Sequence, residues 1–258
     1  MNGFVDWFRA SAPYIHAFRG RTFVIAFGGE VVDDEHFVDL IHDINVLHSL
    51  GIRLVLVHGA RPQIEAALKV GGQRSRFTKG QRITDDAALV AVKHAAGALR
   101  VELEALLSQG LPNSPMAGAD IRVASGNFIT ARPIGIINGI DLQFTGTVRK
   151  VDAVAIRRRL EAEEIVLVPH IGYSPTGEVF NLGWEDVAAS VAIALKADKL
   201  LLFSDWLPTD RKGEVVPELT AKQAEAMARK SGLAPASART LNCALTALAA
   251  GVARAHLL

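Results

Sequence analysis

Three scarcities in this chain of 258 residues each exclude a class of protein: it has one cysteine, almost no net charge and no long apolar run. The single cysteine, Cys243, can form no internal disulfide, and we interpret it as a small apolar residue on a helix rather than a reactive thiol. The 28 Lys and Arg nearly cancel the 27 Asp and Glu, so no basic excess indicates nucleic acid or an anionic membrane as partner. No apolar run approaches the ~20 residues that a membrane span needs.

The N-terminus also has no signal-peptide pattern, because Asp6 and Arg9 interrupt its apolar residues early. We therefore expect a cytoplasmic protein. Hydrophobic residues are plentiful and make up 50% of the 258 residues. This length and composition suffice for one substantial α/β domain or two small ones, with an ample core.

Short β-branched runs alternate with longer stretches in which apolar residues recur at intervals of three and four, as on one face of a helix. The expected strands are Thr22–Phe27, Arg53–Val57, Ile121–Ala124, Glu164–Pro169, Lys199–Phe203 and Arg254–Leu258, and the expected helical stretches are 37–50, 89–106 and 187–195. This alternation predicts an α/β fold, a three-layer αβα sandwich with a mostly parallel central sheet and right-handed crossovers.

Two segments depart from the alternation. Glycines and a proline punctuate short apolar pieces in residues 125–150, which predicts a β-hairpin excursion near 120–150 rather than another helix. Residues 205–220 combine Pro208, Gly213 and Pro217 with several charges, and we expect an exposed loop there.

A separate N-terminal arm, residues 1–20, precedes the main domain, residues 21–258. We expect Pro13 to kink or divide its helical pattern. The apolar stripe can pack on its own domain, between subunits or on a membrane surface, and its thin basic face disfavours the membrane. We favour a subunit interface and hence a homo-oligomer. The stripe consists of Phe4, Trp7, Phe8, Ile15 and Phe18.

Two glycine turns follow predicted strands directly. The run from Thr22 breaks at Gly28-Gly29, and the next strand ends before Gly59-Ala60. Glycines let the backbone turn sharply and let N–H groups approach an anion, and ligands of parallel sheets gather at the carboxyl ends of strands. We interpret His58, at the second turn, as a hydrogen-bonded structural histidine rather than an acid or base.

Six segments in a fixed order carry a resemblance to a known family. Together they resemble the amino acid kinase family, in particular its synthase branch, the N-terminal domains of bacterial N-acetylglutamate synthases. The last segment, Ser125–Ile129, separates that branch from the acetylglutamate kinases. The resemblance runs over essentially the whole chain. The segments are 13–15, 18–25, 47–55, 57–64, 82–85 and 125–129.

The resemblance implies a pocket like that for acetylglutamate in the kinases. For Arg82 the alternatives are a carboxylate clamp through two parallel hydrogen bonds and, as is more common for a loop arginine, a solvated charge or a surface ion pair. For Asn181 the alternatives are a ligand contact and a turn-capping amide. The matching positions are Gly28, Gly29, Gly59, Ala60, Arg82 and Asn181.

The resemblance also implies that kinase chemistry is lost and that this chain has no catalytic residue. Ala26 and Thr240 stand where the family has its two lysines, Glu185 replaces an aspartate, and the turn from Gly232 to Arg239 lacks a glycine pair. Phosphoryl transfer depends on well-placed cations, and losing one such group typically costs ~3 kcal/mol or more. The alternatives are an acetylglutamate kinase with displaced lysines, such as Lys196 or Lys212, and a plain oligomerisation module.

By resemblance, the chain is a catalytically silent regulatory domain that senses L-arginine, the end product of arginine biosynthesis. Tyr14 and His256 match two expected contacts of the effector, between the arm and the last strands. The acidic and glycine-rich segment that completes such a site would follow Leu258, so we expect weak or no arginine binding by this chain alone. Acetyl transfer from acetyl-CoA to glutamate would belong to a further domain, also beyond Leu258. The chain itself is expected to hold no cofactor and no metal.

Overall fold

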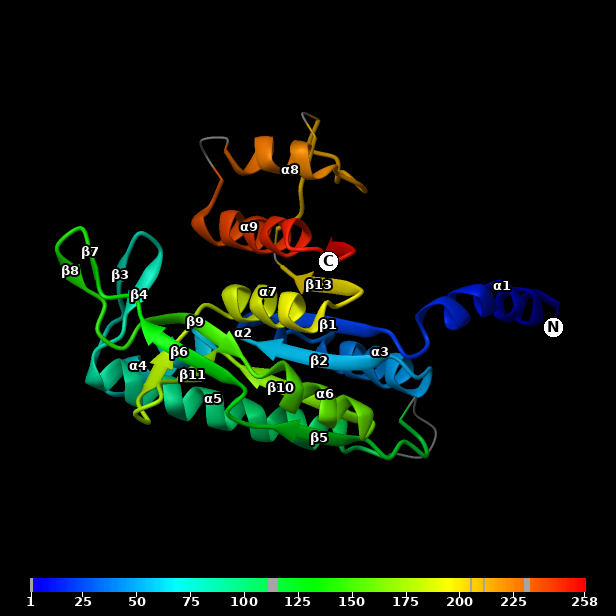
Figure 1. Ribbon diagram of the computed structural model, residues 1–258, viewed down its shortest axis with the longest axis horizontal. Coiled ribbons are helices and arrows are strands. Elements are labelled where there is room, and N and C mark those ends of the chain that lie inside the picture. The colour runs from blue at the N-terminus through cyan, green and yellow to red at the C-terminus, as the bar shows by residue number, and fades with distance from the viewer. Residues whose placement is uncertain (1, 111–115, 205, 211, 230–232) are drawn as a thin grey trace.

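Six parallel strands form the central sheet of the computed structural model, which describes all residues except 1, 111–115, 205, 211 and 230–232 (Figure 1). Their order across the sheet is β14-β13-β1-β2-β10-β5. The predicted strands are confirmed, and β2 is one residue longer, β5 one residue later and β14 one residue shorter than expected. The bounds are β1 Thr22–Phe27, β2 Arg53–His58, β5 Arg122–Ser125, β10 Glu164–Pro169, β13 Lys199–Phe203 and β14 Arg254–Leu257.

Helices cover both faces of the sheet, and its strands are therefore buried on both sides, as is usual for parallel sheets. Successive side chains of β1 point to opposite faces of the sheet. Val24 packs in one core cluster and Phe23 in the other. The first cluster includes residues of α6 (Ala153–Glu161), α7 (Trp184–Leu195) and α9 (Pro235–Ala249), and the second residues of α3 (Phe37–Ser49) and α5 (Asp86–Leu107). The predicted αβα sandwich is therefore confirmed.

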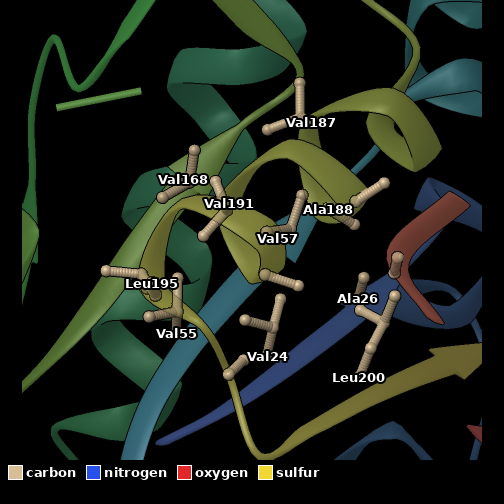
Figure 2. Packing of buried hydrophobic residues seen from close by; sticks show 14 of the residues in the cluster. Val24, Ala26, Val55, Val57, Val168, Val187, Ala188, Val191, Leu195 and Leu200 are labelled. Carbon is tan, nitrogen blue, oxygen red and sulfur yellow. The ribbon is translucent and has the colours of Figure 1, made fainter. Parts of the chain in front are cut away.

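The cluster beneath α7 is formed by small and β-branched side chains. Figure 2 shows Val24 and Val57 of the sheet facing Val187, Ala188 and Val191 of α7. None of these five side chains is exposed to solvent, and full burial of an aliphatic side chain is worth about 1.5–3 kcal/mol. This packing fixes the first turn of α7 against the carboxyl ends of the central strands.

Short helices and strands complete the fold, and most of these short elements were not predicted. A helix such as α6 escapes prediction because only Ile156 and Leu160 of it are buried. The remaining helices are α1 (Asn2–Phe18), α2 (Gly29–Val32), α4 (Arg61–Val70) and α8 (Ala221–Ala228); the short strands β3 (Arg76–Thr78) and β4 (Gln81–Ile83) pair as a hairpin.

The predicted excursion is present as an antiparallel pair, β6 (Ile129–Pro133) with β9 (Gly146–Val151). This pair joins β11 (Ile171–Tyr173) and β12 (Val179–Asn181) in a second sheet of order β12-β11-β6-β9, and a small hairpin, β7 (Ile136–Ile137) with β8 (Ile140–Asp141), lies at its tip. The predicted loop at 205–220 is also found: its described residues contain no helix or strand, only an isolated bridge between Thr209 and Val215.

The arm is a single helix, α1, which extends away from the body of the molecule (Figure 1). Pro13 does not divide it, because the helix continues to Phe18. A proline can kink a helix without ending it, so the other half of the expectation, a kink, stays a prediction. Phe18 packs edge-on against Phe23, with ring centroids 5.4 Å apart, whereas Trp7 and Tyr14 are 65% and 70% exposed. Of the predicted stripe, the side chains of Phe4 and Phe8 lie outside the described part. No described helix combines the length and apolarity needed to cross a membrane.

Candidate functional site

A cavity of about 160 Å³ opens at the carboxyl edge of the sheet, where α4 and α7 begin. Five predicted site residues line it: Gly59, Ala60, Arg82, Asn181 and Thr240. Gly28 and Gly29 lie directly behind this lining, in contact with Gly59 and Ala60. Ala26 does not reach it, because its side chain is fully buried in the cluster beneath α7.

The two glycine turns pack backbone against backbone. A Cβ atom at Gly29 would lie 2.8 Å from the Cα of Ala60, and one at Gly59 would lie 3.3 Å from the Cα of Gly28. The Gly59 N–H also donates to the Phe27 carbonyl at 2.8 Å. The close approach of the two turns therefore requires glycine at position 29 and favours it at position 59, independently of any ligand.

Side chains cover both turns. The Glu30 carboxylate lies against Gly28, where either of its oxygens would clash with an added Cβ, and the Trp184 indole lies over Gly59, with Cδ1 only 2.6 Å from such a Cβ. Both residues line the cavity. The backbone positions that would have to approach a phosphate thus face a carboxylate and an indole ring.

Arg82 is buried and already paired. Its guanidinium donates to Glu65 Oε1 at 2.8 Å and to the Ser75 hydroxyl, and it lies 5.0 Å from the centre of the Phe77 ring. Burial lowers the pKa of Arg82, an effect that Glu65 opposes. Two of its five donors serve these partners, so Arg82 is a buried cation at the cavity wall, ion-paired as one alternative interpretation expected and not a solvated charge.

Asn181 belongs to a buried hydrogen-bond network. Its side-chain amide donates to the Thr84 hydroxyl at 3.0 Å, and the hydroxyls of Thr84 and Thr145 lie 2.8 Å apart. The partner is thus a threonine between β4 and α5, and not the backbone of a turn as the capping interpretation expected. The network connects that junction with β12 and the start of β9.

Arg239 joins three separate elements around the cavity. Its Nε lies 3.3 Å from Glu185 Oε1 on α7, and its Nη1 donates to the Gly80 carbonyl of the β3–β4 turn at 3.0 Å. Burial raises the pKa of Glu185, and Arg239 opposes this rise. The expectation of a turn from Gly232 to Arg239 is wrong from Pro235 onwards, because α9 begins there, and Gly232 lies outside the described residues.

Thr240 lies inside α9 and not in a loop. Its hydroxyl bonds to the Ala236 carbonyl one turn earlier, at 3.2 Å. No lysine lines the cavity in the described part of the chain. Lys196 ends α7 in a left-handed conformation, and both it and Lys212 are exposed. Neither brings a displaced cation to the glycine turns.

Two buried histidines lie beneath the cavity, at the ends of the adjacent strands β2 and β10. His58 is buried and its Nδ1 lies 3.2 Å from the Gly59 carbonyl, in agreement with the structural role predicted. His170, which the sequence analysis missed, lines the cavity; its signal was a polar residue directly after a buried strand. Burial lowers the pKa of His58 to about 4 and that of His170 to about 3, so both rings are uncharged at neutral pH.

Tyr14 lines a different pocket, between the arm and the edge of the sheet, together with Arg21, Lys199 and Arg254. His256 lies on β14, beside Leu201 of the adjacent strand β13, and does not line this pocket. Burial lowers the pKa of His256, and nearby Lys199 and Arg254 lower it further. The structure therefore places the two predicted effector contacts at one corner of the fold, in a basic environment.

Solved structures similar to this chain include two of N-acetylglutamate synthase from Neisseria gonorrhoeae. One is complexed with coenzyme A and N-acetyl-glutamate (TM-score 0.89, 36% identity, covering 99% of this chain and 58% of that one). The other is complexed with coenzyme A and L-arginine (TM-score 0.90, 36% identity, 99% and 60% covered). Carbamate kinase from Giardia lamblia, with a TM-score of 0.66 at 14% identity and 90% of each chain covered, shares the fold.

Curated relatives are longer than this chain. An amino-acid acetyltransferase of Ralstonia nicotianae is 51% identical over 257 residues, which are 99% of this chain and 57% of the relative. One of Pseudomonas fluorescens is 48% identical over 258 residues, which are 100% of this chain and 60% of the relative. The chain thus spans less than two thirds of the length of these relatives.

The family model itself covers nearly the whole chain. The matched region, residues 21–258, begins where the arm ends, and contains the central sheet, both glycine turns and the complete cavity lining. The model is described as the amino acid kinase family, and this chain belongs to that family.

Proposed function

We propose that the chain is a regulatory, amino acid kinase-like domain of the N-acetylglutamate synthase type, and that it does not itself transfer phosphoryl groups. The covered glycine turns carry this proposal: Glu30 and Trp184 occupy the approach to the backbone that would hold a phosphate. The lysine-free lining among the described residues supports it. Each missing stabilising cation costs about 3 kcal/mol or more in the transition state.

The size of the cavity also disfavours the alternative, an acetylglutamate kinase. A cavity of about 150 Å³ holds a molecule the size of benzene, and the cavity here is of similar volume, about 160 Å³. That volume suits a small metabolite, and a nucleotide bound with it would have to lie outside this cavity. The purified chain, incubated with ATP and N-acetyl-L-glutamate, should form no acyl phosphate in a hydroxamate assay.

The activity of the parent protein is part of the same proposal. Relatives named amino-acid acetyltransferase exceed this chain in length, so we assign acetyl transfer from acetyl-CoA to glutamate to a further region of a longer cytoplasmic protein. This chain needs no cofactor of its own under that assignment. Its part would be regulation and assembly in the first step of arginine biosynthesis.

We place the proposed arginine site in the arm pocket because Tyr14 lines it. The Neisseria synthase, which has been solved with L-arginine, supports an arginine effector in general. A guanidinium ligand needs carboxylate or carbonyl acceptors. The carboxylate in this pocket is Asp198, which already lies 3.3 Å from Arg21. We therefore expect calorimetry to detect weak or no L-arginine binding by this chain.

In the longer protein, Tyr14→Ala should weaken inhibition by L-arginine while leaving acetyl transfer without arginine largely unchanged. Tyr14 lines the arm pocket and is far from the cavity lining. The matched control is Val101→Ala, at an exposed position of α5 outside both the arm and that pocket, which should leave inhibition intact. Equal loss of inhibition in both variants, or loss of transfer with Tyr14→Ala, would contradict the assignment.

The arm should also hold subunits together. Deleting residues 2–12 removes the projecting part of α1 but keeps Phe18 on Phe23 and the pocket around Tyr14. We expect a lower particle mass in light scattering and a thermal transition that stays cooperative, because burial of an exposed aromatic such as Trp7 at an interface supplies much of its affinity. An unchanged mass would show that the arm is not an interface.

A further inference from the structure

The hairpin β3–β4 has little support of its own. It forms a two-stranded sheet separate from the two larger sheets, and it stands out from the body of the molecule (Figure 1). Of the residues in its two strands only Arg82 is buried. A hairpin of two strands is marginally stable by itself, so the position of this one depends on its contacts with other elements.

The base of the hairpin is held by α4 and by the segment that leads into β9. Arg82 pairs with Glu65 of α4 at 2.8 Å, and the Thr145 hydroxyl donates to the Arg82 carbonyl. The Phe144 N–H donates to the Thr84 carbonyl at 3.0 Å. These contacts fix the end of β4, and the turn at the opposite end of the hairpin needs an anchor of its own.

The tip of the hairpin is a tight turn of defined shape. Lys79 and Gly80 have φ angles of 47° and 77°, and Thr78 pairs with Gln81 on either side of them. Two central residues with positive φ are the pattern of a type I′ turn. The turn therefore holds the Gly80 carbonyl in one direction.

Arg239 binds this carbonyl and a carboxylate of α7 together. Its Nη1 donates to the Gly80 carbonyl at 3.0 Å, and its Nε lies 3.3 Å from Glu185 Oε1. The guanidinium lies close against the turn, because a Cβ atom added at Gly80 would be 2.7 Å from Nη1. Glu185 is held in turn by α9, since its own carbonyl accepts from Cys243 Sγ at 3.0 Å and both residues are buried.

The guanidinium suits this position because it is planar and presents several donors in fixed directions. One group can therefore bind Glu185 and Gly80 at the same time, whereas the ammonium of a lysine is a single point charge. The cavity lining includes Gly80 of the hairpin as well as Glu185 and Arg239 of the two helices. The bond between Arg239 and Gly80 thus connects two parts of that lining.

We infer that Arg239 is a latch that holds the β3–β4 turn against α7 and α9. When its bond to Gly80 breaks, the hairpin moves away from the helices about its fixed base, and the cavity widens. The inference goes beyond the proposed function, because it concerns the movement of the hairpin whatever the cavity holds. Arg239 is a positioning residue in this role.

The distance between two spin labels, one on the turn and one on α9, tests this inference. Lys79→Cys and Thr246→Cys supply exposed thiols for the labels, and the native Cys243 is buried. In pulsed dipolar spectroscopy the labelled parent should show mainly one short distance. Arg239→Gln should raise the ratio of long to short distances at least about tenfold, the usual effect of losing one charge-assisted hydrogen bond.

Arg76→Gln is the matched control. It removes another arginine of the same hairpin, whose ion pair with Asp85 is exposed, and exposed pairs contribute little. It should change the ratio by less than about threefold. An equal rise in this control would overturn the inference, because the hairpin would then respond to any lost contact.

A second variant covers the case in which Arg239→Gln fails to fold because the Glu185 carboxylate is left buried without its cation. Glu185→Gln combined with Arg239→Gln removes both charges, and Glu185→Gln alone is its reference. The double variant should again raise the ratio of long to short distances about tenfold over that reference. An unchanged ratio in the folded Arg239 variants would overturn the inference.

Discussion

Ala26→Lys is expected to lower the free energy of unfolding by about 3–5 kcal/mol and to produce no kinase. Ala26 is 0% exposed and packs in the cluster beneath α7 that Figure 2 shows, near Ala188 and Leu200. A lysine there must overfill a packed core, which costs about 1–3 kcal/mol, and must bury a charge without a partner. The measurement is urea unfolding, followed by an assay for ATP-dependent phosphorylation of N-acetyl-L-glutamate.

Two control variants separate the effect of side-chain size from the effect of burying a charge. Ala26→Met adds a side chain of similar length without charge, and should cost about 1–3 kcal/mol. Ala98→Lys, at an exposed position of α5, should change stability by less than about 0.5 kcal/mol. A lysine variant that is as stable as the parent and phosphorylates its substrate would refute both the buried position and the silent role.

Acid should destabilise the domain strongly below about pH 6.5. The pKa values of His58 and His170 are lowered to about 4 and about 3 by burial, so the unfolded chain binds protons that the folded chain does not. Their contribution to stability is therefore complete above pH 6.5 and is lost as the pH falls toward 4 and 3. Each pKa unit is worth about 1.4 kcal/mol, so the loss amounts to several kcal/mol.

Urea unfolding of His58→Gln and His170→Gln between pH 7 and 4 measures this effect. Each variant should be less stable than the parent at pH 7 but lose less stability on acidification, because glutamine does not titrate. His94→Gln, at an exposed position of α5, should follow the parent. Glu185 acts in the opposite direction, since its raised pKa favours the folded state on acidification. The parent and all variants contain Glu185, so this effect cancels in the comparison. Parallel curves for the parent and both buried variants would contradict the prediction.

The sheet was predictable because most of its strands are short apolar runs, two of which end at glycine turns. In residues 22–27 and 164–169 the apolar residues show no helical period, so the length and composition of each run identify it as a strand. The hairpin β3–β4 was not predictable, because three-residue strands fall below any periodic signal. The helix α4 was missed for a related reason: only Ile64 and Leu68 of its ten residues are buried.

Site residues were predictable where the position of the backbone determines their role. They were not predictable where the direction of the side chain determines it. Gly59 and Ala60 lie in the cavity wall because a turn after a parallel strand must lie at that edge. Trp184 and Glu30 were missed because their role depends on which way an indole and a carboxylate point. The alternation of side chains along β1 did contain one overlooked signal: Ala26 shares a face with Val24 and must point into the core.

The contact between the two glycine turns has a consequence for how such sequences are read. Gly29 is required, and Gly59 is favoured, because the backbone of one turn crosses that of the other at close to van der Waals distance. That steric requirement persists in any protein with this crossing, whether or not it handles phosphate. Glycines after the first two strands are therefore a signature of architecture, and an activity should be inferred from the side chains that lie over them.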